Sequence, residues 1–281
     1  AWELSRYPKT WVPHLERFDE IWAPSEFIRA AIADAVDRPV FHMPLAVDLS
    51  LHSFVGRRGL GLPEHAFIYF FLFDFSSYME RKNPFAVLEA FDRLVQRHPR
   101  APLHLELKHK GGEASPGDLE RFKRAISKHR DQIQILDRTL TDTDVKNLVR
   151  EANCFVSLHR SEGFGRGMAE AMALGVPTIA TGYSGNLDFM TENNSFMVRH
   201  ALIPVAKGAY VEGEGQVWAE PDIAHAVDLM EQVYLDRRLA RAKAAQAAKD
   251  LRRLFSPLAV GLRYAARQEQ ILHSRTAGGR G

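Results

Sequence analysis

The sequence predicts an α/β fold, with a Rossmann-like parallel sheet and helices on both of its faces. Between residues 66 and 200 one pattern recurs, in which a short apolar segment of strand length is followed by an amphipathic segment of helical period. The composition, 46% hydrophobic and 26% charged over 281 residues, is ordinary for a globular protein and excludes a fibrous or disordered chain. Strands that alternate with helices pair in parallel, so four strand–helix units in series predict one parallel sheet.

The first unit begins with the most apolar segment of the chain. Residues 66–75, AFIYFFLFDF, predict a buried strand. Asn83 and Pro84 follow as the cap and first residue of a helix, Leu88 lies on its buried face, and Pro99 ends it.

The second and third units repeat the pattern with more polar helices. Residues 103–107 predict a strand, and a basic helix follows near residues 118–130. Residues 133–136 predict the next strand, and Asp142 begins the next helix.

The fourth unit contains the most distinctive sequence. Residues 155–158 predict a strand, a glycine-rich turn leads into a helix that stops at Gly175, and residues 177–180 predict another strand. Residues 199–217 form an unusually long connection. Beyond residue 220 the pattern is helical, with a final helix over residues 257–272 and a disordered tail after it.

The first fifty residues predict a single strand–helix–strand unit. Its strands lie near residues 20–23 and 40–43, and its helix runs over residues 25–36. One such unit cannot cover both faces of its own sheet, so it either joins the larger sheet or belongs to a second one. We favour the second arrangement.

Charge and cysteine content narrow the classes of function. The formal net charge of +2 gives no reason to expect a nucleic-acid partner. The only cysteine, Cys154, lies in an apolar run, which excludes an internal disulfide and fits a reducing, cytoplasmic compartment. No stretch reaches the roughly 18 apolar residues of a membrane span. The basic helices near residues 121–130 and 237–253 are expected to be solvated, and contact with an anionic membrane surface is the alternative.

Residues 157–175, SLHRSEGFGRGMAEAMALG, carry the strongest chemical signal. Three glycines around the start of a helix let the backbone approach a ligand closely and leave N–H groups free. Together these features favour the binding of an anion. Glu162 and Glu170 flank this site, and a carboxylate beside an anion is explained if it accepts hydrogen bonds from sugar hydroxyls. The spacing alone also fits a tight turn with a favourable acid near a helix N-terminus.

Residues 162–181, EGFGRGMAEAMALGVPTIAT, resemble the glutamate-pair segment of the retaining glycosyltransferases of family 4 (glycosyl transferases group 1), which have the two-lobed GT-B fold. Three more segments resemble this family in the same order: ERKNPFAVLEAF, RTLTDTDVKNLVREANCFVSLHRSEGFG and TGYSGNLDFM. The resemblance implies a donor lobe in residues 51–255, a remnant of the acceptor lobe in residues 1–50, and a crossover helix with a flexible tail in residues 256–281. Most of the N-terminal lobe would then be missing from these residues.

The resemblance also implies a role for each matching residue. Lys82 would hold the donor diphosphate, Glu162 would bind hydroxyls of the transferred sugar, and Glu170 would accept hydrogen bonds from the ribose. The remaining donor-binding residues would be Gly163, Phe164, Gly165 and Arg166 near the phosphates, and Asp137, Arg138 and Leu140 beside the base. The family's usual arginine five residues before the lysine is replaced by Ser77, and either Arg81 or Arg166 could supply the missing charge.

Two other signals have structural explanations. Asp142-Thr143-Asp144 matches a DxD metal motif, but Thr141 and Asp144 also form a helix capping box, which we favour. No metal and no cofactor is therefore predicted. His159 lies next to the glutamate segment, and a buried structural histidine is the favoured interpretation.

The sequence therefore predicts a metal-independent retaining glycosyltransferase. It would move a sugar from a nucleotide-diphosphate donor to an acceptor hydroxyl on a glycan or lipid-linked glycan, as in polysaccharide biosynthesis. Two alternatives remain, a nucleotide-sugar-binding module that needs a partner chain and a GT-B nucleotide-sugar epimerase. With so small an N-terminal lobe, the chain alone is expected to bind the donor but to transfer sugar poorly.

Overall fold

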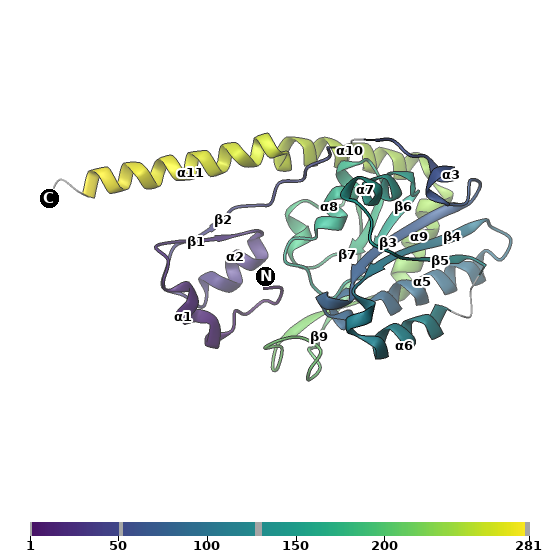
Figure 1. Cartoon of the computed structure of the whole chain (residues 1–281), viewed down its shortest axis with the longest axis horizontal. Helices are drawn as coiled ribbons and strands as arrows, with labels where there is room; N and C mark the ends of the chain where they lie inside the picture. The colour runs from purple at the N-terminus through teal and green to yellow at the C-terminus, as the bar shows by residue number, and fades with distance from the viewer. Residues whose placement is uncertain (1, 51–52, 127–130, 279–281) are drawn as a thin grey trace.

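The computed structural model describes residues 2–50, 53–126 and 131–278. Its centre is a six-stranded, all-parallel sheet with the strand order β5-β4-β3-β6-β7-β8 (Figure 1). The strands are β3 (Phe67–Asp74), β4 (Leu103–Lys110), β5 (Ile133–Asp137), β6 (Cys154–Ser157), β7 (Thr178–Thr181) and β8 (Phe196–Val198). The predicted α/β fold is confirmed.

Helices cover both faces of this sheet. One face packs against α5 (Pro84–Arg97), α6 (Pro116–Ile126) and α9 (Ile223–Leu235). The other packs against α7 (Asp142–Glu151), α8 (Arg166–Ala173) and α10 (Arg237–Phe255). Successive residues of β3 enter the two cores in turn, Phe67 and Tyr69 on one side and Ile68 and Phe70 on the other. A strand buried on both faces reads as a continuous apolar run, which is why β3 was predictable.

The strand β4 departs from this apolar rule on one face. Leu103, Leu105 and Leu107 enter one core, whereas the alternate positions are the buried polar residues His104, Glu106 and Lys108. The register pairs these three with Ile68, Phe70 and Leu72 of β3, so they share the face covered by α7 and α8. This polar row leads to the carboxyl end of the sheet.

Residues 2–43, which we call the N-terminal unit, have a small sheet of their own. Within it β1 (Ile21–Ala23) and β2 (Val40–His42) pair in parallel, and α2 (Glu26–Ala33) connects them. Before β1 lie the short helices η1 (Lys9–Trp11) and α1 (Val12–Leu15). The predicted connection over residues 199–217 contains β9 (His200–Pro204) and a long loop, which leads to the antiparallel partner strand β10 (Val217–Pro221). This hairpin shares a hydrophobic cluster with the N-terminal unit.

The last helix, α11 (Pro257–Gly278), runs on from α10 and passes over the N-terminal unit (Figure 1). Arg267 forms an ion pair with Glu20, and the rings of Tyr264 and Trp22 meet edge to face at 5.0 Å. The helix continues through Gly278, so the predicted disorder of residues 273–278 is wrong; once a helix is formed, extending it costs much less than starting one. Residues 279–281 lie outside the described part.

Three short helices flank β3. α3 (Arg57–Leu60) precedes β3, and η2 (Phe75–Ser77) and α4 (Met79–Lys82) lead from β3 to α5. Asn83 occupies the N-cap position of α5 as predicted, but its side chain makes no capping bond. Instead its amide donates to the carbonyl oxygen of Leu158, 3.0 Å away, because Asn83 has the left-handed conformation (φ 54°). This bond ties the α4–α5 junction to the end of β6.

Candidate active site

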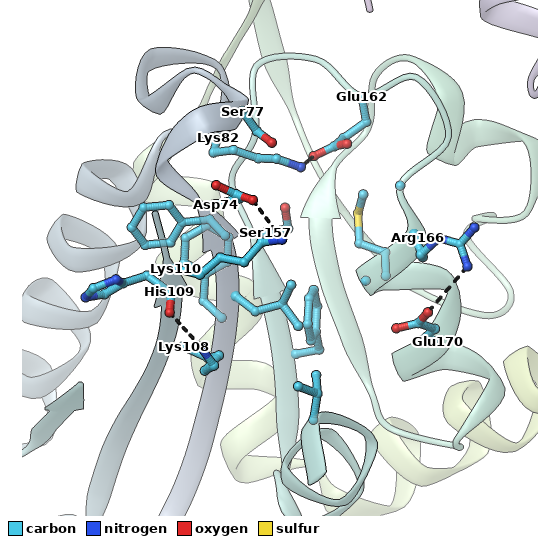
Figure 2. A pocket seen from close by; sticks show the side chains of 18 of the residues that line it. Asp74, Ser77, Lys82, Lys108, His109, Lys110, Ser157, Glu162, Arg166 and Glu170 are labelled. Carbon is cyan, nitrogen blue, oxygen red and sulfur yellow. Dashed lines mark hydrogen bonds and ion pairs between the residues drawn. The ribbon is translucent and has the colours of Figure 1, made fainter. Parts of the chain in front are cut away.

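A cavity of about 520 Å³ opens at the carboxyl ends of β3, β4 and β6, beside the start of α8 (Figure 2). Parallel α/β sheets bind ligands at this edge, at the point where the direction of strand addition reverses. Here the chain adds β4 and β5 on one side of β3 and then adds β6 on the other side. The cavity is lined by Phe71, Leu72, Phe73, Asp74, Ser77, Lys82, Lys108, His109, Lys110, Thr139, Leu140, Val145, Phe155, Ser157, Glu162, Gly165, Arg166, Gly167, Met168 and Glu170.

The glycine-rich turn brings backbone N–H groups to the cavity. Gly165 is the N-cap of α8 with φ 93°, a conformation that other residues rarely adopt. A Cβ on Gly165 would also lie 2.6 Å from the Met168 side chain. The first N–H groups of α8 have no acceptor within the helix and carry its partial positive charge. The predicted anion site is therefore geometrically available, and its function remains a prediction.

Lys82 and Glu162 meet at the mouth of the cavity. Lys82 Nζ lies 2.5 Å from Glu162 Oε1, joining the end of α4 to the loop after β6 (Figure 2). Burial by itself raises the pKa of Glu162, but the charges of Lys82 and Arg81 outweigh burial and lower the pKa to about 2. Glu162 is consequently an anion held between two cations.

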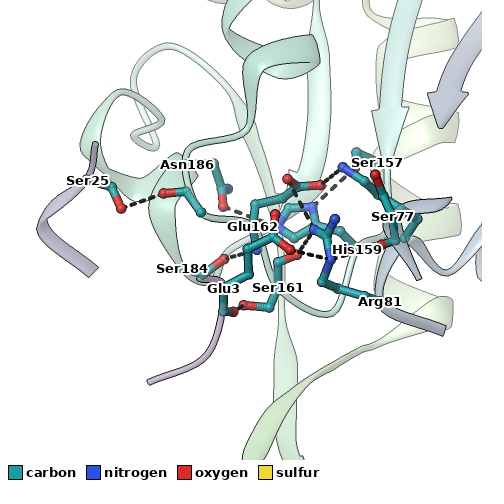
Figure 3. A network of polar contacts seen from close by, with 12 residues as sticks. Glu3, Ser25, Ser77, Arg81, Ser157, His159, Ser161, Glu162, Ser184 and Asn186 are labelled. Atoms are coloured by element: carbon teal, nitrogen blue, oxygen red, sulfur yellow. Dashed lines mark hydrogen bonds and ion pairs between the residues drawn. The ribbon is translucent and has the colours of Figure 1, made fainter. Parts of the chain in front are cut away.

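Arg81 lies behind Glu162 and outside the cavity lining. Its side chain is only 2% exposed, and its guanidinium lies 3.3 Å from the Glu162 carboxylate and 2.8 Å from that of Glu3. It also donates to the carbonyl oxygen of Ser161 at 2.8 Å (Figure 3). Arg81 thus positions Glu162 and its loop.

The N-terminal unit reaches this network directly. The backbone carbonyl of Glu3 accepts a hydrogen bond from Ser161, and Tyr210 of the β9–β10 loop donates to the Glu3 carboxylate at 3.0 Å. Ser25 donates to the carbonyl of Gly163 at 2.5 Å (Figure 3). Burial and the nearby Glu162 raise the pKa of Glu3, against the opposing effect of Arg81. No sequence pattern marked Glu3 as part of a site.

The loop after β7 holds the backbone on either side of Glu162. The Glu162 N–H donates to Ser184 Oγ at 2.8 Å, and the Gly185 N–H donates to the Glu162 carbonyl at 2.9 Å. A Cβ on Gly185 would lie 2.3 Å from the Gly163 oxygen, so only glycine fits there. Ser184 has φ 75°, an unusual conformation for a residue with a side chain.

Glu170 lies one turn into α8, on the cavity wall. Burial raises the pKa of its carboxyl, and Arg166, 3.9 Å away, acts in the opposite direction. Arg166 is largely exposed and lines the cavity. Of the two arginines predicted as substitutes for the cation missing at Ser77, Arg166 is therefore the one whose side chain can reach a bound molecule.

The other predicted donor-binding residues are distributed around the cavity. Leu140 lines it, and Asp137 and Arg138 line an adjoining cavity of about 420 Å³ that shares Asp74, His109, Lys110 and Thr139 with the first. The Phe164 ring packs against Phe189 and Phe255 in the core. Gly163 lies under the N-terminal unit, outside the cavity lining.

The two structural interpretations agree with the geometry. His159 is fully buried; its Nδ1 accepts from Ser157, and its Nε2 donates toward Asn186 Oδ1 at 3.1 Å. Burial lowers the pKa of His159, which keeps the ring neutral. Thr141 caps α7 by accepting the Asp144 N–H at 3.1 Å. Within the described ranges no group of three or more metal-binding side chains is found.

Several cavity residues were missed from the sequence. Asp74, Lys108, His109 and Lys110 all lie at the carboxyl ends of β3 and β4. Polar residues at alternate positions of a strand predicted to be central, LHLELKHK, are the signal that could have identified Lys108.

Residues 58–250 match the sequence profile of the family described as glycosyl transferases group 1. The chain belongs to this family. Among its relatives, the Vi polysaccharide biosynthesis protein VipC/TviE of Salmonella typhi is 31% identical over 117 residues, which are 41% of this chain and 18% of that protein. Mannosylfructose-phosphate synthase of Agrobacterium fabrum is 30% identical over 104 residues, 35% of this chain and 22% of that enzyme. The match thus spans about a fifth of each relative.

Solved structures confirm the fold of this group 1 glycosyltransferase. Anabaena Alr3699/HepE in complex with UDP and glucose aligns with a TM-score of 0.75 and 15% identity, over 94% of this chain and 68% of that one. Sucrose-phosphate synthase from Thermosynechococcus elongatus aligns with a TM-score of 0.70 and 19% identity, over 91% of this chain and 59% of that one. The predicted relationship to the GT-B fold is confirmed. Among the described residues, no helix is both long and apolar enough to cross a membrane.

Proposed function

We propose that this group 1 glycosyltransferase is a retaining, family 4 enzyme that transfers a sugar from a nucleotide-diphosphate donor to an acceptor hydroxyl. The observation that carries the proposal is the arrangement of Glu162 and Glu170 along one cavity, with Lys82 and the start of α8 beside them. A nucleotide sugar has hydroxyl-bearing rings on both sides of a diphosphate, and this arrangement offers acceptors for both rings and donors for the diphosphate.

The charges of the site support a role for Lys82 in binding phosphate. Glu162 has two cationic partners, so Lys82 can turn to a diphosphate while Arg81 continues to neutralise the carboxylate. Arg166 and the free N–H groups of α8 provide further positive charge. These groups would stabilise the departing diphosphate without a metal, and loss of one such preorganised group typically costs about 100- to 1000-fold in rate.

The proposed chemistry needs no separate base from the protein. The resemblance to retaining enzymes implies that the acceptor attacks the face from which the diphosphate departs, and that a donor phosphate oxygen takes the acceptor proton. Glu162 would hold hydroxyls of the transferred sugar, and Glu170 those of the ribose. Gly165 and Arg166 would border the phosphates through their backbone, with Gly163 and Phe164 supporting that backbone from outside the cavity, and Asp137, Arg138 and Leu140 would lie nearer the base.

The similar proteins support a nucleotide-sugar donor. The complexes of Anabaena Alr3699/HepE contain UDP with glucose, UDP-glucose or UDP. The names of the curated relatives refer to polysaccharide biosynthesis and to a sugar-phosphate synthase. We propose a glycan or lipid-linked glycan as acceptor; the basic helices are expected to be solvated, and contact with a membrane surface is the alternative. A binding module that acts with a partner chain is the second candidate, favoured by the small, two-stranded sheet of the N-terminal unit.

Calorimetry with two glutamate variants tests the proposed roles. Glu170→Ala should weaken binding of a free nucleoside diphosphate at least tenfold, because charge-assisted hydrogen bonds to the ribose are lost. Glu162→Ala should retain binding of the free diphosphate and weaken only its sugar conjugate. Glu89→Ala, which removes an exposed acid of α5 paired with Arg93, is the matched control and should change neither affinity. Equal losses for both ligands in both variants would refute the division of roles.

A further inference from the structure

The cavity ends in a buried cation that the proposed mechanism does not use. Lys108 lies on β4, its residue is 7% exposed, and its side chain lines the cavity. In Figure 2 it lies at the end away from Lys82 and Glu162. Leu72, Leu140 and Phe155 are among the apolar residues that line the same cavity.

Lys108 has too few partners for a buried ammonium group. Its Nζ donates to the carbonyl oxygen of His109, 2.5 Å away, and an ammonium has three N–H donors. Among the described residues no carboxylate lies within ion-pair distance of it, in contrast to Lys82, Lys110 and Lys146. A buried cation without an acid is costly unless another acceptor reaches it. The remaining direction open to such an acceptor is the cavity.

The ring of the neighbouring residue His109 does not reach Lys108. The two residues alternate along β4, and the His109 ring packs against Phe73, Phe75 and Phe122 on the opposite face of the sheet. Only the backbone carbonyl of His109 lies beside the Lys108 ammonium group. The donors that Lys108 has left over on the cavity side therefore indicate a polar ligand there.

The identity of that ligand follows from the order of groups along the cavity, and this step rests on the proposed function. With the diphosphate at Lys82 and the ribose at Glu170, the nucleobase is the part that remains for the end at Lys108. An ammonium group only donates hydrogen bonds, so it attracts a carbonyl oxygen and opposes an amino group at the same position.

We propose that Lys108 reads a carbonyl oxygen of the donor base and selects a base of the oxo type. Uracil and guanine carry an oxygen where cytosine and adenine carry an amino group. The donor would accordingly be a uridine, thymidine or guanosine diphosphate sugar, and its cytidine and adenosine counterparts would be rejected.

Two pairs of nucleotides test this selection: UDP and CDP have the same shape, and GDP and ADP differ at the same oxygen or amino position and also in the 2-amino group of guanine. Calorimetry measures UDP against CDP, GDP against ADP, and pyrophosphate alone. The wild-type chain should bind at least one oxo nucleotide about 10- to 100-fold more tightly than its amino partner, the range of a hydrogen bond to a charged group. Lys108→Met should reduce that ratio to about one and leave pyrophosphate affinity unchanged.

Two further variants keep the test decisive. Lys108→Gln, whose amide can present either an N–H or an oxygen, should also bring the ratio to about one, and it carries the test if Lys108→Met does not fold. Lys123→Met removes a half-exposed lysine of α6 outside the cavity and should retain the wild-type ratio.

The outcomes separate the inference from the function on which it rests. Equal wild-type affinities within both pairs, a ratio that survives Lys108→Met, or a parallel loss of pyrophosphate binding would each overturn the inference alone. Failure of the wild-type chain to bind any of the four nucleotides would overturn the proposed function, and the inference with it.

Discussion

At the scale of single residues, the site is organised by unequal pairing of charges. Glu162 has two cationic partners, Lys82 and Arg81, while Lys108 has no acid within ion-pair distance among the residues described. Arg81 is shared with Glu3, so two cations face two carboxylates here, and Lys82 and Arg81 together keep Glu162 ionised. The lone cation at the other end of the cavity instead remains available to a neutral acceptor.

The pairing of Glu162 predicts a loss of stability in acid. Its folded pKa, about 2, lies below the ordinary value of 4.5, so its contribution is complete above that value and disappears as the pH falls toward 2. Between pH 6 and pH 4 this residue should account for about 1 kcal/mol of the decrease in unfolding free energy. Urea denaturation should show a smaller decrease over this interval for Glu162→Gln than for the wild-type chain. Identical pH slopes for the two proteins would contradict the assigned pairing.

At the scale of elements, the strands buried on both faces were the most predictable. The continuous apolar run of β3 and the Thr141 cap of α7 follow from local chemistry alone. The β9–β10 hairpin was missed because β9 is mostly exposed and a long loop containing three glycines joins it to β10. Lys108 was missed as a site residue, and the burial of the predicted Arg81 was not anticipated, for another reason: burial depends on partners from distant segments, which no local period encodes.

The fit between the loops after β6 and β7 predicts the effect of one methyl group. Gly185→Ala should move the Glu162–Gly163 backbone, since the new Cβ would lie 2.3 Å from the Gly163 oxygen. We expect a loss of about 2 kcal/mol in unfolding free energy, as in overpacked cores, and weaker binding of the nucleotide sugar. Thermal denaturation and calorimetry measure the two effects.

The control for this substitution is Gly261→Ala in α11, where nothing lies within 4 Å of the added Cβ. It should leave ligand binding unchanged and stabilise the helix slightly. If Gly185→Ala behaved like Gly261→Ala, the close contact between the two loops would not constrain Glu162.

At the scale of the whole molecule, contacts from the first and last segments of the chain join the β1–β2 sheet to the rest of the protein. The N-terminal unit contacts the site through Glu3 and Ser25, and α11 returns to it through Tyr264 and Arg267. Large side chains of α11 nevertheless stay exposed, among them Leu258 and Leu262. The prediction from the resemblance that this helix crosses between two lobes stays a prediction.

This arrangement leads us to expect donor binding without efficient transfer. Among the described residues, none of those lining the cavity comes from the N-terminal unit, so this unit offers no group inside the cavity to orient an acceptor. A chain of these 281 residues should bind a nucleotide sugar by calorimetry and give little new glycoside when an acceptor is added. Product analysis by mass spectrometry measures the transfer. Efficient formation of a glycoside would contradict the expectation, and an isomer of the donor sugar would indicate an epimerase instead.

The hydrogen bond from Ser25 to the Gly163 carbonyl joins the N-terminal unit to the residue that follows Glu162. The Glu3–Arg81 ion pair joins them again at a partner of Glu162. Any rotation of the small sheet away from the large one must therefore break contacts that hold the Glu162 carboxylate in place. In this protein the angle between these two sheets and the position of Glu162 cannot change independently.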